Sequence, residues 1–355
     1  MSSSISVPVV RSGVKRPSGP LLLVVLAALL LAAVVLSFGI GPLKVAPGEV
    51  LRIVLARFGL ADSEGLSTRD IAVVWNLRIP RALMGALVGA ALALAGAGLQ
   101  GLFGNPLADP GVVGVSQGAA LGAVGAIVLG ANALGEWTVP VAAFVGGMLS
   151  TTMIYLLARP GRGSGTVTLL LVGIAIGAAC SAAIGFLTYR ADASQLQSLV
   201  FWQMGSLGSA DWSDVAAALP VFVVGLVGML LLATPLDMLA LGERQAQHIG
   251  LDVRRARVLL VTCSALLVGA AVAFAGTIGF VGLVVPHLVR LLAGPGHRWL
   301  LPLSALTGAT LLVVADTAAR TLDPPSEIPL GLFSAAIGAP FFLWLILHQR
   351  PGGAR

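Results

Sequence analysis

The sequence predicts an all-α integral membrane protein with about ten transmembrane helices. Of its 355 residues, 57% are hydrophobic and only 10% are charged, whereas a soluble domain carries about 25% charged residues. The apolar runs reach the roughly 20 residues that a helix needs to cross a bilayer. They lack the alternation of a β-barrel strand, so a barrel is excluded. The 45 glycines are typical of tightly packed transmembrane helices, in which small residues let the backbones approach each other.

The first apolar run, residues 21–40, follows a short basic segment. It is too long for a signal peptide and no Ala-x-Ala cleavage site ends it, so we interpret it as an uncleaved helix. Residues 1–20 are then a cytoplasmic tail. Residues 41–77 are mixed and charged, and we expect an external connection that holds a short surface helix.

The second helix, residues 82–102, has small residues at every fourth position, which predicts a face for close helix packing. These positions are Gly85, Gly89, Ala93, Ala97 and Gly101. Eight further apolar runs continue the chain, and a semi-polar stretch at 195–210 is expected to form a short helix near the outer face. The eight runs are expected at 112–130, 139–158, 168–188, 213–234, 258–275, 278–293, 299–315 and 329–347.

The charges give this arrangement an orientation. Lys and Arg are concentrated in the segments that the helix count places on one side, and the opposite segments are net acidic. By the positive-inside rule the basic side is cytoplasmic, so both termini, including the tail 349–355, are inside.

Two segments of the chain resemble each other. Residues 88–96 and 268–276 are nearly identical, and in the predicted topology their helices run in opposite directions. Inverted repeats are a feature of transporters, although chance similarity among Ala and Gly is the plain alternative.

A polar, charged segment, 241–257, interrupts two apolar runs. It is too polar to lie in lipid and too short to be a domain. Such a segment is either an unspecialised loop or a surface that a soluble partner binds, and the sequence pattern alone leaves both interpretations open.

The residues of a catalytic centre are missing. Lys15 and Lys44 are the only lysines, and neither belongs to a phosphate-binding Gly-x-x-x-x-Gly-Lys motif. Ion-driven carriers usually contain ionisable residues deep in the membrane. Here only Asp316, expected at the interface, and His287, expected to be a structural histidine, come near that position. Cys180 and Cys263 lie in apolar runs, and we interpret them as core residues rather than as a disulfide or a metal site.

Several motifs together resemble the FecCD family of permeases, which are the membrane subunits of ATP-binding-cassette (ABC) importers for iron-siderophores, haem and cobalamin. The similarity extends from about residue 21 to residue 348. The motifs are Arg78-Ile-Pro-Arg81, Gly104-Asn-Pro-Leu-Ala-Asp-Pro110, Gly114-Val-Ser-Gln-Gly118, Phe201-Trp-Gln-Met-Gly-Ser-Leu207, Gly276-Thr-Ile-Gly-Phe-Val-Gly-Leu-Val-Val-Pro-His287, and Ala315-Asp316 with Arg320.

This resemblance implies a ten-helix permease domain over 21–348, similar to the cobalamin-importer permease, that forms a homodimer in the bacterial inner membrane. It implies two ATPase subunits on the cytoplasmic side and a periplasmic substrate-binding protein outside. The chain would be a transport subunit rather than an enzyme, with no cofactor of its own, because ATP and Mg²⁺ would bind to the ATPase. Nucleic acid is not expected as a partner.

The resemblance also assigns roles to single residues. Within a coupling segment, 237–257, it implies contact with the ATPase. It implies a cytoplasmic gate in the pore, and docking of the binding protein through a positive cluster at the outer mouth. The coupling residues are Glu243, Ala246, Gly250, Leu251 and Arg254; the gate residues are Asn105, Leu107, Thr166 and Val167; the docking residues are Arg78, Arg81 and Arg320.

The cargo is less closely defined. The stretch from Gly185 through Leu207 looks most like haem permeases, so haem is the first expectation, ahead of a ferric siderophore and cobalamin. A self-contained secondary transporter or channel is the alternative of another class. The scarcity of intramembrane charges and the coupling-like segment both argue against it.

Overall fold

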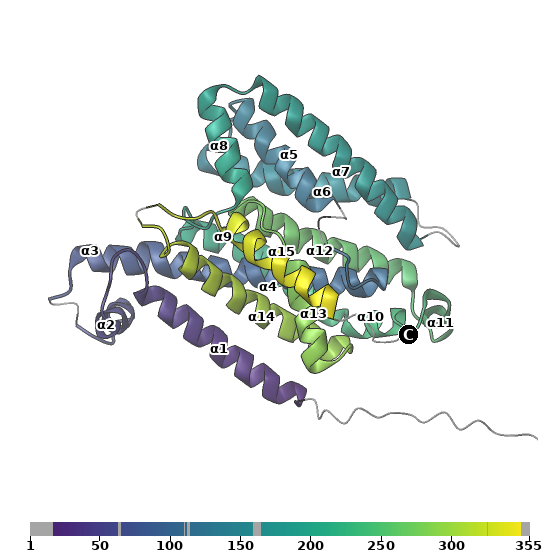
Figure 1. Ribbon diagram of the computed structural model, residues 1–355, viewed down its shortest axis with the longest axis horizontal. Helices are drawn as coiled ribbons and strands as arrows, with labels where there is room; N and C mark the ends of the chain where they lie inside the picture. Colours follow the sequence, from purple (N-terminus) through teal and green to yellow (C-terminus); the bar gives the residue numbers. More distant parts are fainter. Residues whose placement is uncertain are drawn as a thin grey trace, which may run out of the picture.

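The computed structural model describes residues 17–62, 65–109, 111, 114–158, 165–324 and 326–348, and the regular structure within these ranges is helical, as predicted. Most of the longer helices lie side by side and run in roughly one direction, whereas α2 and α8 run across them (Figure 1). They are α1 (Gly19–Gly39), α2 (Pro47–Arg57), α3 (Thr68–Ile71), the π-helical η1 (Ala72–Arg78), α4 (Ile79–Phe103), α5 (Val115–Val128), the short η3 (Gly135–Trp137), α6 (Thr138–Ala158), α7 (Gly165–Arg190), α8 (Ala193–Met204), α9 (Trp212–Leu231), α10 (Ala233–Leu239), α11 (Glu243–His248), α12 (Val253–Ala275), α13 (Val281–Ala293), α14 (His297–Ala319) and α15 (Leu330–His348).

Within the described ranges, seven helical segments are long and apolar enough to cross a membrane, and three shorter apolar helices bring the number to the ten that were predicted. The shorter ones include α5 and α13, of 14 and 13 residues. Neither reaches the roughly 20 residues that span a bilayer unaided. The predicted ranges were longer: Leu129 and Gly130 form a turn after α5, and residues 278–280 before α13 are not helical.

Helix α4 lies at the centre, and the predicted small-residue face is its contact surface with α14. A Cβ atom added at Gly89 would collide with the carbonyl oxygen of Gly308, and one added at Gly308 would collide with that of Gly89. The two backbones therefore touch, which only glycine permits at both positions. Ala93 borders the same contact, so the prediction of a packing face is confirmed.

The prediction that this helix begins at residue 82 is wrong. A continuous helical segment runs from Thr68 through α3 and η1 into α4. Pro80 lacks the N–H that an α-helix would donate to the carbonyl four residues earlier. The preceding turns are wider, and the N–H of Ile79 donates to the carbonyl of Val74. Charged residues obscured this extension in the sequence.

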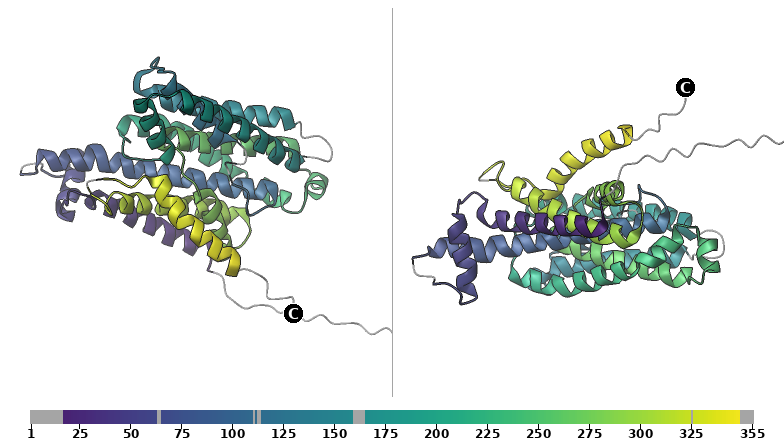
Figure 2. Two further views of the ribbon diagram at one scale, coloured as in Figure 1. Left: turned by 45° about the horizontal axis from the view of Figure 1, so that its top comes forward. Right: turned by 90° about the horizontal axis from the view of Figure 1, so that it is seen from below.

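The expected surface helix in 41–77 is present as α2, and it packs on the extended part of α4. Val50 and Ile53 of α2 form a small apolar cluster with Val74 and Ile79. Figure 2 shows α2 lying across the end of α1 rather than along it.

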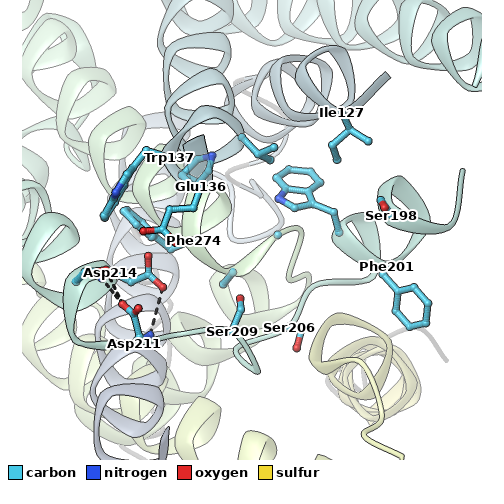
Figure 3. Close-up of a pocket in the computed structure, with 17 residues that line it drawn as sticks. Ile127, Glu136, Trp137, Ser198, Phe201, Ser206, Ser209, Asp211, Asp214 and Phe274 are labelled. Carbon is cyan, nitrogen blue, oxygen red and sulfur yellow. Dashed lines mark hydrogen bonds between the residues drawn. The ribbon is translucent and has the colours of Figure 1, made fainter. Parts of the chain in front are cut away.

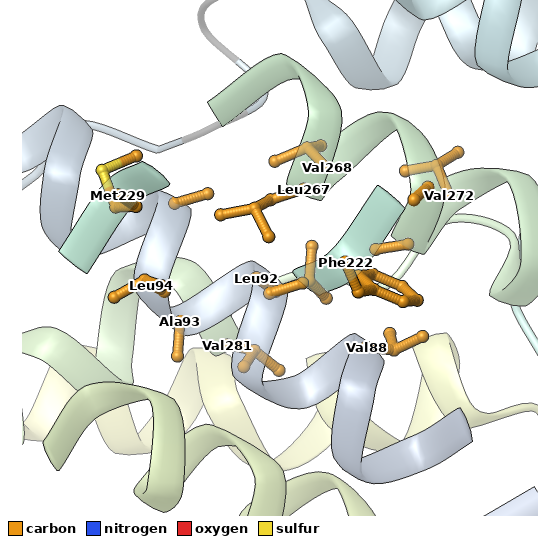
Figure 4. Packing of buried hydrophobic residues seen from close by; sticks show 14 of the residues in the cluster. Val88, Leu92, Ala93, Leu94, Phe222, Met229, Leu267, Val268, Val272 and Val281 are labelled. Atoms are coloured by element: carbon orange, nitrogen blue, oxygen red, sulfur yellow. The ribbon is translucent and has the colours of Figure 1, made fainter. Parts of the chain in front are cut away.

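The segments of the proposed inverted repeat lie on neighbouring antiparallel helices, α4 and α12. Gly85, near the start of α4, lies next to Leu207. Ser206, the neighbour of Leu207 in the chain, donates its N–H to the carbonyl of Ala275 at the end of α12. The start of α4 is therefore close to the end of α12. Val88 and Val268 both belong to the main core, which Figure 4 shows between α4, α9 and α12.

Helices α5, α6 and α7 form a second group that packs on α12 from the other side (Figure 1). The hydroxyl of Ser150 in α6 donates to the carbonyl of Gly114 at the start of α5, at 3.0 Å. Cys180 in α7 and Cys263 in α12 are free and buried, as expected of core residues.

Candidate functional site

The coupling segment is a small folded unit rather than a loop. The polar stretch divides into α11 and the first turn of α12, so its last charged residues, from Arg254 to Arg257, belong to a transmembrane helix. Ala246 is completely buried, whereas Glu243 and Arg254 are at least partly exposed. Figure 1 shows α11 protruding at one end of the molecule.

Glycine geometry and an ion pair fix how α11 joins α12. Gly250 has φ +95°, and nothing lies within 4 Å of the position of an added Cβ atom. Any residue other than glycine would be strained here by the left-handed backbone conformation itself, since no neighbouring atom obstructs its side chain. The N–H of Leu251 donates to the carbonyl of Ala246 at 3.0 Å. Glu243 forms an ion pair with Arg257, of which only 4% is exposed.

A second contact between polar side chains, which the sequence did not reveal, anchors the base of this unit. Asp237 of α10 accepts from the backbone N–H of His297, the first residue of α14, at 2.8 Å, and contacts its ring Nδ1 at 2.7 Å. His297 is 5% exposed and lies beside Gly101 near the end of α4. The C-terminal end of α4, α10 and the N-terminal end of α14 are thereby joined. The signal in the sequence was weak, because 60 residues separate the two partners.

The gate residues lie at the same end. Asn105 and Leu107 are in the turn that follows α4, where Asn105 Oδ1 accepts from the N–H of Leu107 at 2.9 Å. This hydrogen bond stabilises the turn, and a purely structural function in the turn is the alternative to a function in the pore. Leu107 and Val167 are 53% and 65% exposed. Thr166 lies in the first turn of α7, and its side chain is outside the described residues.

The three docking arginines are buried, which contradicts the expectation of an exposed positive cluster. Arg78, Arg81 and Arg320 are 4%, 9% and 3% exposed. Each guanidinium is held by groups of this chain rather than presented to a partner. The sequence missed this because it could not show which segments return to the outer end of α4.

Arg78 and Arg320 cap the last turn of α1. Arg78 Nη1 donates to the carbonyls of Phe38 and Gly39, at 2.8 and 3.0 Å, and Arg320 donates to the carbonyl of Ser37. The final carbonyls of a helix lack partners within the helix and carry partial negative charge. Burial lowers the pKa of Arg320 to about 10, so it remains charged near neutral pH.

Arg81 binds two carboxylates. Its Nη2 lies 2.9 Å from Asp316 Oδ1, and its Nη1 lies 2.9 Å from Glu327 Oε2. Asp316 lies near the end of α14, as expected, and it is buried there. Helix α14 continues to Ala319 and places Asp316, 3% exposed, against Arg81.

A cavity of about 640 Å³ opens at the same outer end, between α8 and the ends of α5, α9 and α12. Figure 3 shows Trp137, Glu136 and Phe274 on one side and Asp211 with Asp214 below them. Asp211 caps α9 by accepting from the N–H of Asp214 at 2.9 Å, and this hydrogen bond lowers the pKa of Asp211. Serine hydroxyls and aromatic rings make up much of the lining, and no histidine is among the described lining residues.

Known proteins resemble this chain along most of its length. The chain is 50% identical over 286 residues to the hemin transport system permease protein HmuU of Yersinia pestis, covering 78% of this chain and 84% of HmuU. It is 47% identical over 274 residues to the cobalamin import system permease protein BtuC of Halobacterium salinarum, covering 77% and 73% of the two chains. It is 41% identical over 327 residues to the vitamin B12 import system permease protein BtuC of Salmonella typhimurium, covering 91% and 94%.

A solved structure of a metal-chelate type ABC transporter in an inward-facing conformation superposes with a TM-score of 0.82 at 33% identity, covering 93% of this chain and 99% of that one. The model of the FecCD transport family matches residues 29–348. The ten apolar helices of the described ranges, α4 among them, and the resemblance of the motifs are thus explained together: this chain belongs to the FecCD transport family.

Proposed function

We propose that this chain is the permease subunit of an ABC importer that moves haem, or a related iron chelate, from the periplasm to the cytoplasm. The observation that carries the proposal is the 50% identity to a hemin permease over 286 residues. The chain would reside in the bacterial inner membrane with both termini in the cytoplasm. It would hydrolyse no ATP and bind no cofactor, because ATP and Mg²⁺ would bind to a partner ATPase.

The functional transporter would contain two copies of this chain. In support, only 17% of the apolar window of α7 is buried within one copy. Several large apolar side chains of α15, such as Ile337 and Trp344, are likewise more than half exposed. Either lipid or a second copy of the chain must cover these apolar surfaces. A pore that lies on a two-fold axis is formed by two copies, so at least part of the surface would contact the second copy. In this arrangement Asn105, Leu107, Thr166 and Val167 would line the cytoplasmic constriction.

Two ATPase subunits would bind at the end of the molecule where α11 protrudes. The accessible side chains of Glu243 and Arg254 offer polar contacts to a soluble partner. Ala246 would hold α11 against the body of the permease, while Gly250 and Leu251 fix the angle at which α11 meets α12. Because Asp237 and His297 join the base of this unit to α14, a displacement of α11 would be passed to the transmembrane helices.

A periplasmic binding protein would dock at the opposite end. The buried arginines support this indirectly, since Arg78 and Arg320 bind carbonyls within 37–43 and Arg81 binds Asp316 and Glu327. They would shape the docking surface rather than contact the partner.

Cobalamin is the second candidate, supported by 47% and 41% identity to two cobalamin permeases. A ferric siderophore is the third, supported by the similarity to a metal-chelate type transporter. The outer cavity, with polar and aromatic lining and no histidine among its described residues, suits passage of a bulky ligand without tight coordination, which would slow its release.

The experiment is uptake by proteoliposomes that contain this chain, its ATPase and its binding protein. We expect ATP-dependent accumulation of haem, and none when the ATPase carries a substitution that prevents hydrolysis. Preferential uptake of cobalamin or a ferric siderophore would show that the proposed cargo is wrong, while the proposal of an ABC importer would stand. Uptake driven by an ion gradient in vesicles without the ATPase would overturn the importer in favour of a secondary transporter.

A further inference from the structure

A largely apolar groove of about 590 Å³ lies where α1 meets the loop that leads to α2. Its wall is the last two turns of α1, where Val35, Leu36 and Ile40 are 53%, 60% and 45% exposed. Its base includes Val45 and Val50, which are buried. The accessible Lys44 is the charged residue in its lining.

The groove faces the membrane. Helix α1 has the highest hydropathy of the candidate spans, and only 6% of its apolar window is buried. A helix of this kind has lipid as its neighbour along most of its surface. The part of the groove wall on α1, at Val35 and Leu36, therefore borders lipid.

The other end of the groove lies at the level of lipid headgroups. Helix α2 crosses the end of α1 (Figure 2), and it buries Val50 and Ile53 while Arg52 and Arg57 remain accessible. Accessible charged side chains are costly in hydrocarbon, so α2 lies outside the bilayer core. Lys44 stands just before it, so its ammonium group is at the boundary between acyl chains and water.

We propose that this groove binds an anionic phospholipid from the leaflet at this end of α1, with one acyl chain along Val35, Leu36 and Ile40 and the phosphate at Lys44. An acyl chain in the bilayer is already out of water, so van der Waals packing against this apolar wall, rather than removal from water, would hold it. Charge selects the headgroup. Of the neighbouring acids, Glu49 accepts a hydrogen bond from the N–H of Ala46, and neither Glu49 nor Asp323 lines the groove.

The test is native mass spectrometry of the delipidated, detergent-solubilised protein titrated with phosphatidylglycerol or with phosphatidylcholine of the same acyl chains. We expect the first phosphatidylglycerol to bind more tightly than phosphatidylcholine. Lys44→Gln should weaken it about fivefold, which corresponds to ~1 kcal/mol for a single cation at a membrane surface. Arg190→Gln, which removes an exposed cation at the end of α7, is the matched control and should leave the affinity unchanged.

A second pair of variants tests the apolar wall. Ile40→Trp should fill the groove and weaken the binding of both lipids, whereas Leu31→Trp, at an exposed position of α1 outside the lining, should not. Equal affinity for the two headgroups in the wild type, or equal loss with Lys44→Gln and Arg190→Gln, would overturn the proposal. It would also fall if a cysteine introduced at Ile40 crosslinked two copies of the chain, because the occupant would then be protein.

Discussion

Arg81 Nη2 lies 2.9 Å from Asp316 Oδ1, and the contact joins the start of α4 to the last turn of α14 across 235 residues of sequence. The two side chains are 11% and 5% exposed. Arg81 Nε also donates to both carboxylate oxygens at 3.0 Å. A buried charge that loses its partner costs more than the pair contributes when complete. This pair therefore makes the outer ends of two central helices depend on each other.

Removing one partner should destabilise the protein strongly. We expect Asp316→Ala to reduce the free energy of unfolding by ~3–5 kcal/mol, because it leaves the Arg81 guanidinium buried without its main acceptor. The loss should appear as a lower Tm of the detergent-solubilised protein and a lower yield in the membrane. Arg190→Gln, at an exposed position, should change stability by less than about 0.5 kcal/mol.

Replacing both partners separates the pair from the individual residues. We expect the double variant Arg81→Met with Asp316→Leu to lose much less stability than the sum of its two single variants, since the buried pair is removed together and the remaining Glu327 side chain is 40% exposed to solvent. Strictly additive losses would contradict a coupled pair. Normal binding-protein association by a stable double variant would agree with a role for Arg81 in shaping the outer surface rather than in contact.

The sequence was informative about features that are local and poor about contacts between distant segments. The small-residue face of α4 follows from a spacing of four, and this periodicity does not depend on what packs against it. The prediction that Arg78 and Arg81 lie where that helix begins was close, since they flank the start of α4. Their environment was not, because Phe38 and Asp316 come to them from α1 and α14. A charged residue near a helix end is solvated unless another segment of the chain covers it. The sequence alone does not show which segment will do so.

Helix ends were predicted least well for a related reason. Arg69, Asp70 and Arg78 suggested a loop before α4, yet the extended helix is held by apolar contacts of Val74 and Ile79 with α2. Similarly, Arg254 and Arg257 were grouped with the polar segment, although both belong to α12. In each case the helix continues past charged residues because tertiary packing favours it.

The coupling prediction concerns Gly250. Its φ of +95° is unfavourable for L-residues and most of all for β-branched ones. We expect Gly250→Val to insert in the membrane normally and to change the angle between α11 and α12, so that less ATPase co-purifies and ATP-dependent uptake falls. Gly48→Val is the control, since Gly48 also has open space around it but has no positive φ. Full uptake and full ATPase association by Gly250→Val would remove the coupling role.

The orientation of the helices can be tested at Ser194. This residue is exposed in the first turn of α8, and positive-inside reasoning places α8 outside. A cysteine at Ser194, in a variant in which Cys180 and Cys263 are replaced by alanine, should react with an impermeant maleimide in cells whose outer membrane alone is opened. A reporter fused after Arg350 should be active only in its cytoplasmic form. Labelling of Ser194→Cys only after the inner membrane is opened would overturn the topology.

The last prediction concerns Gln100, a buried polar residue near the end of α4. Pro286 in α13 has no N–H, so the carbonyl of Gly282, four residues earlier, cannot receive its usual helical hydrogen bond. Gln100 Nε2 lies 3.3 Å from that carbonyl and 3.3 Å from the carbonyl of Leu283. Gln100 Oε1 accepts from Arg290 Nη2 at 3.0 Å. The amide thus compensates for the proline and fastens α13 to α4.

Gln100→Leu should therefore cost ~1–3 kcal/mol of stability, the usual penalty for leaving a buried polar group without a partner. Part of this loss should be recovered in the double variant Gln100→Leu with Pro286→Ala, since the new N–H at position 286 can donate to the carbonyl of Gly282. Arg290 loses the same acceptor with and without Pro286→Ala, so its contribution cancels in the double-mutant cycle. The measurement is the Tm of the four proteins in one detergent. If Gln100→Leu is as destabilising in the Pro286→Ala background as in the wild type, then Gln100 stabilises the helix pair through Arg290 and not through the carbonyl that proline leaves free.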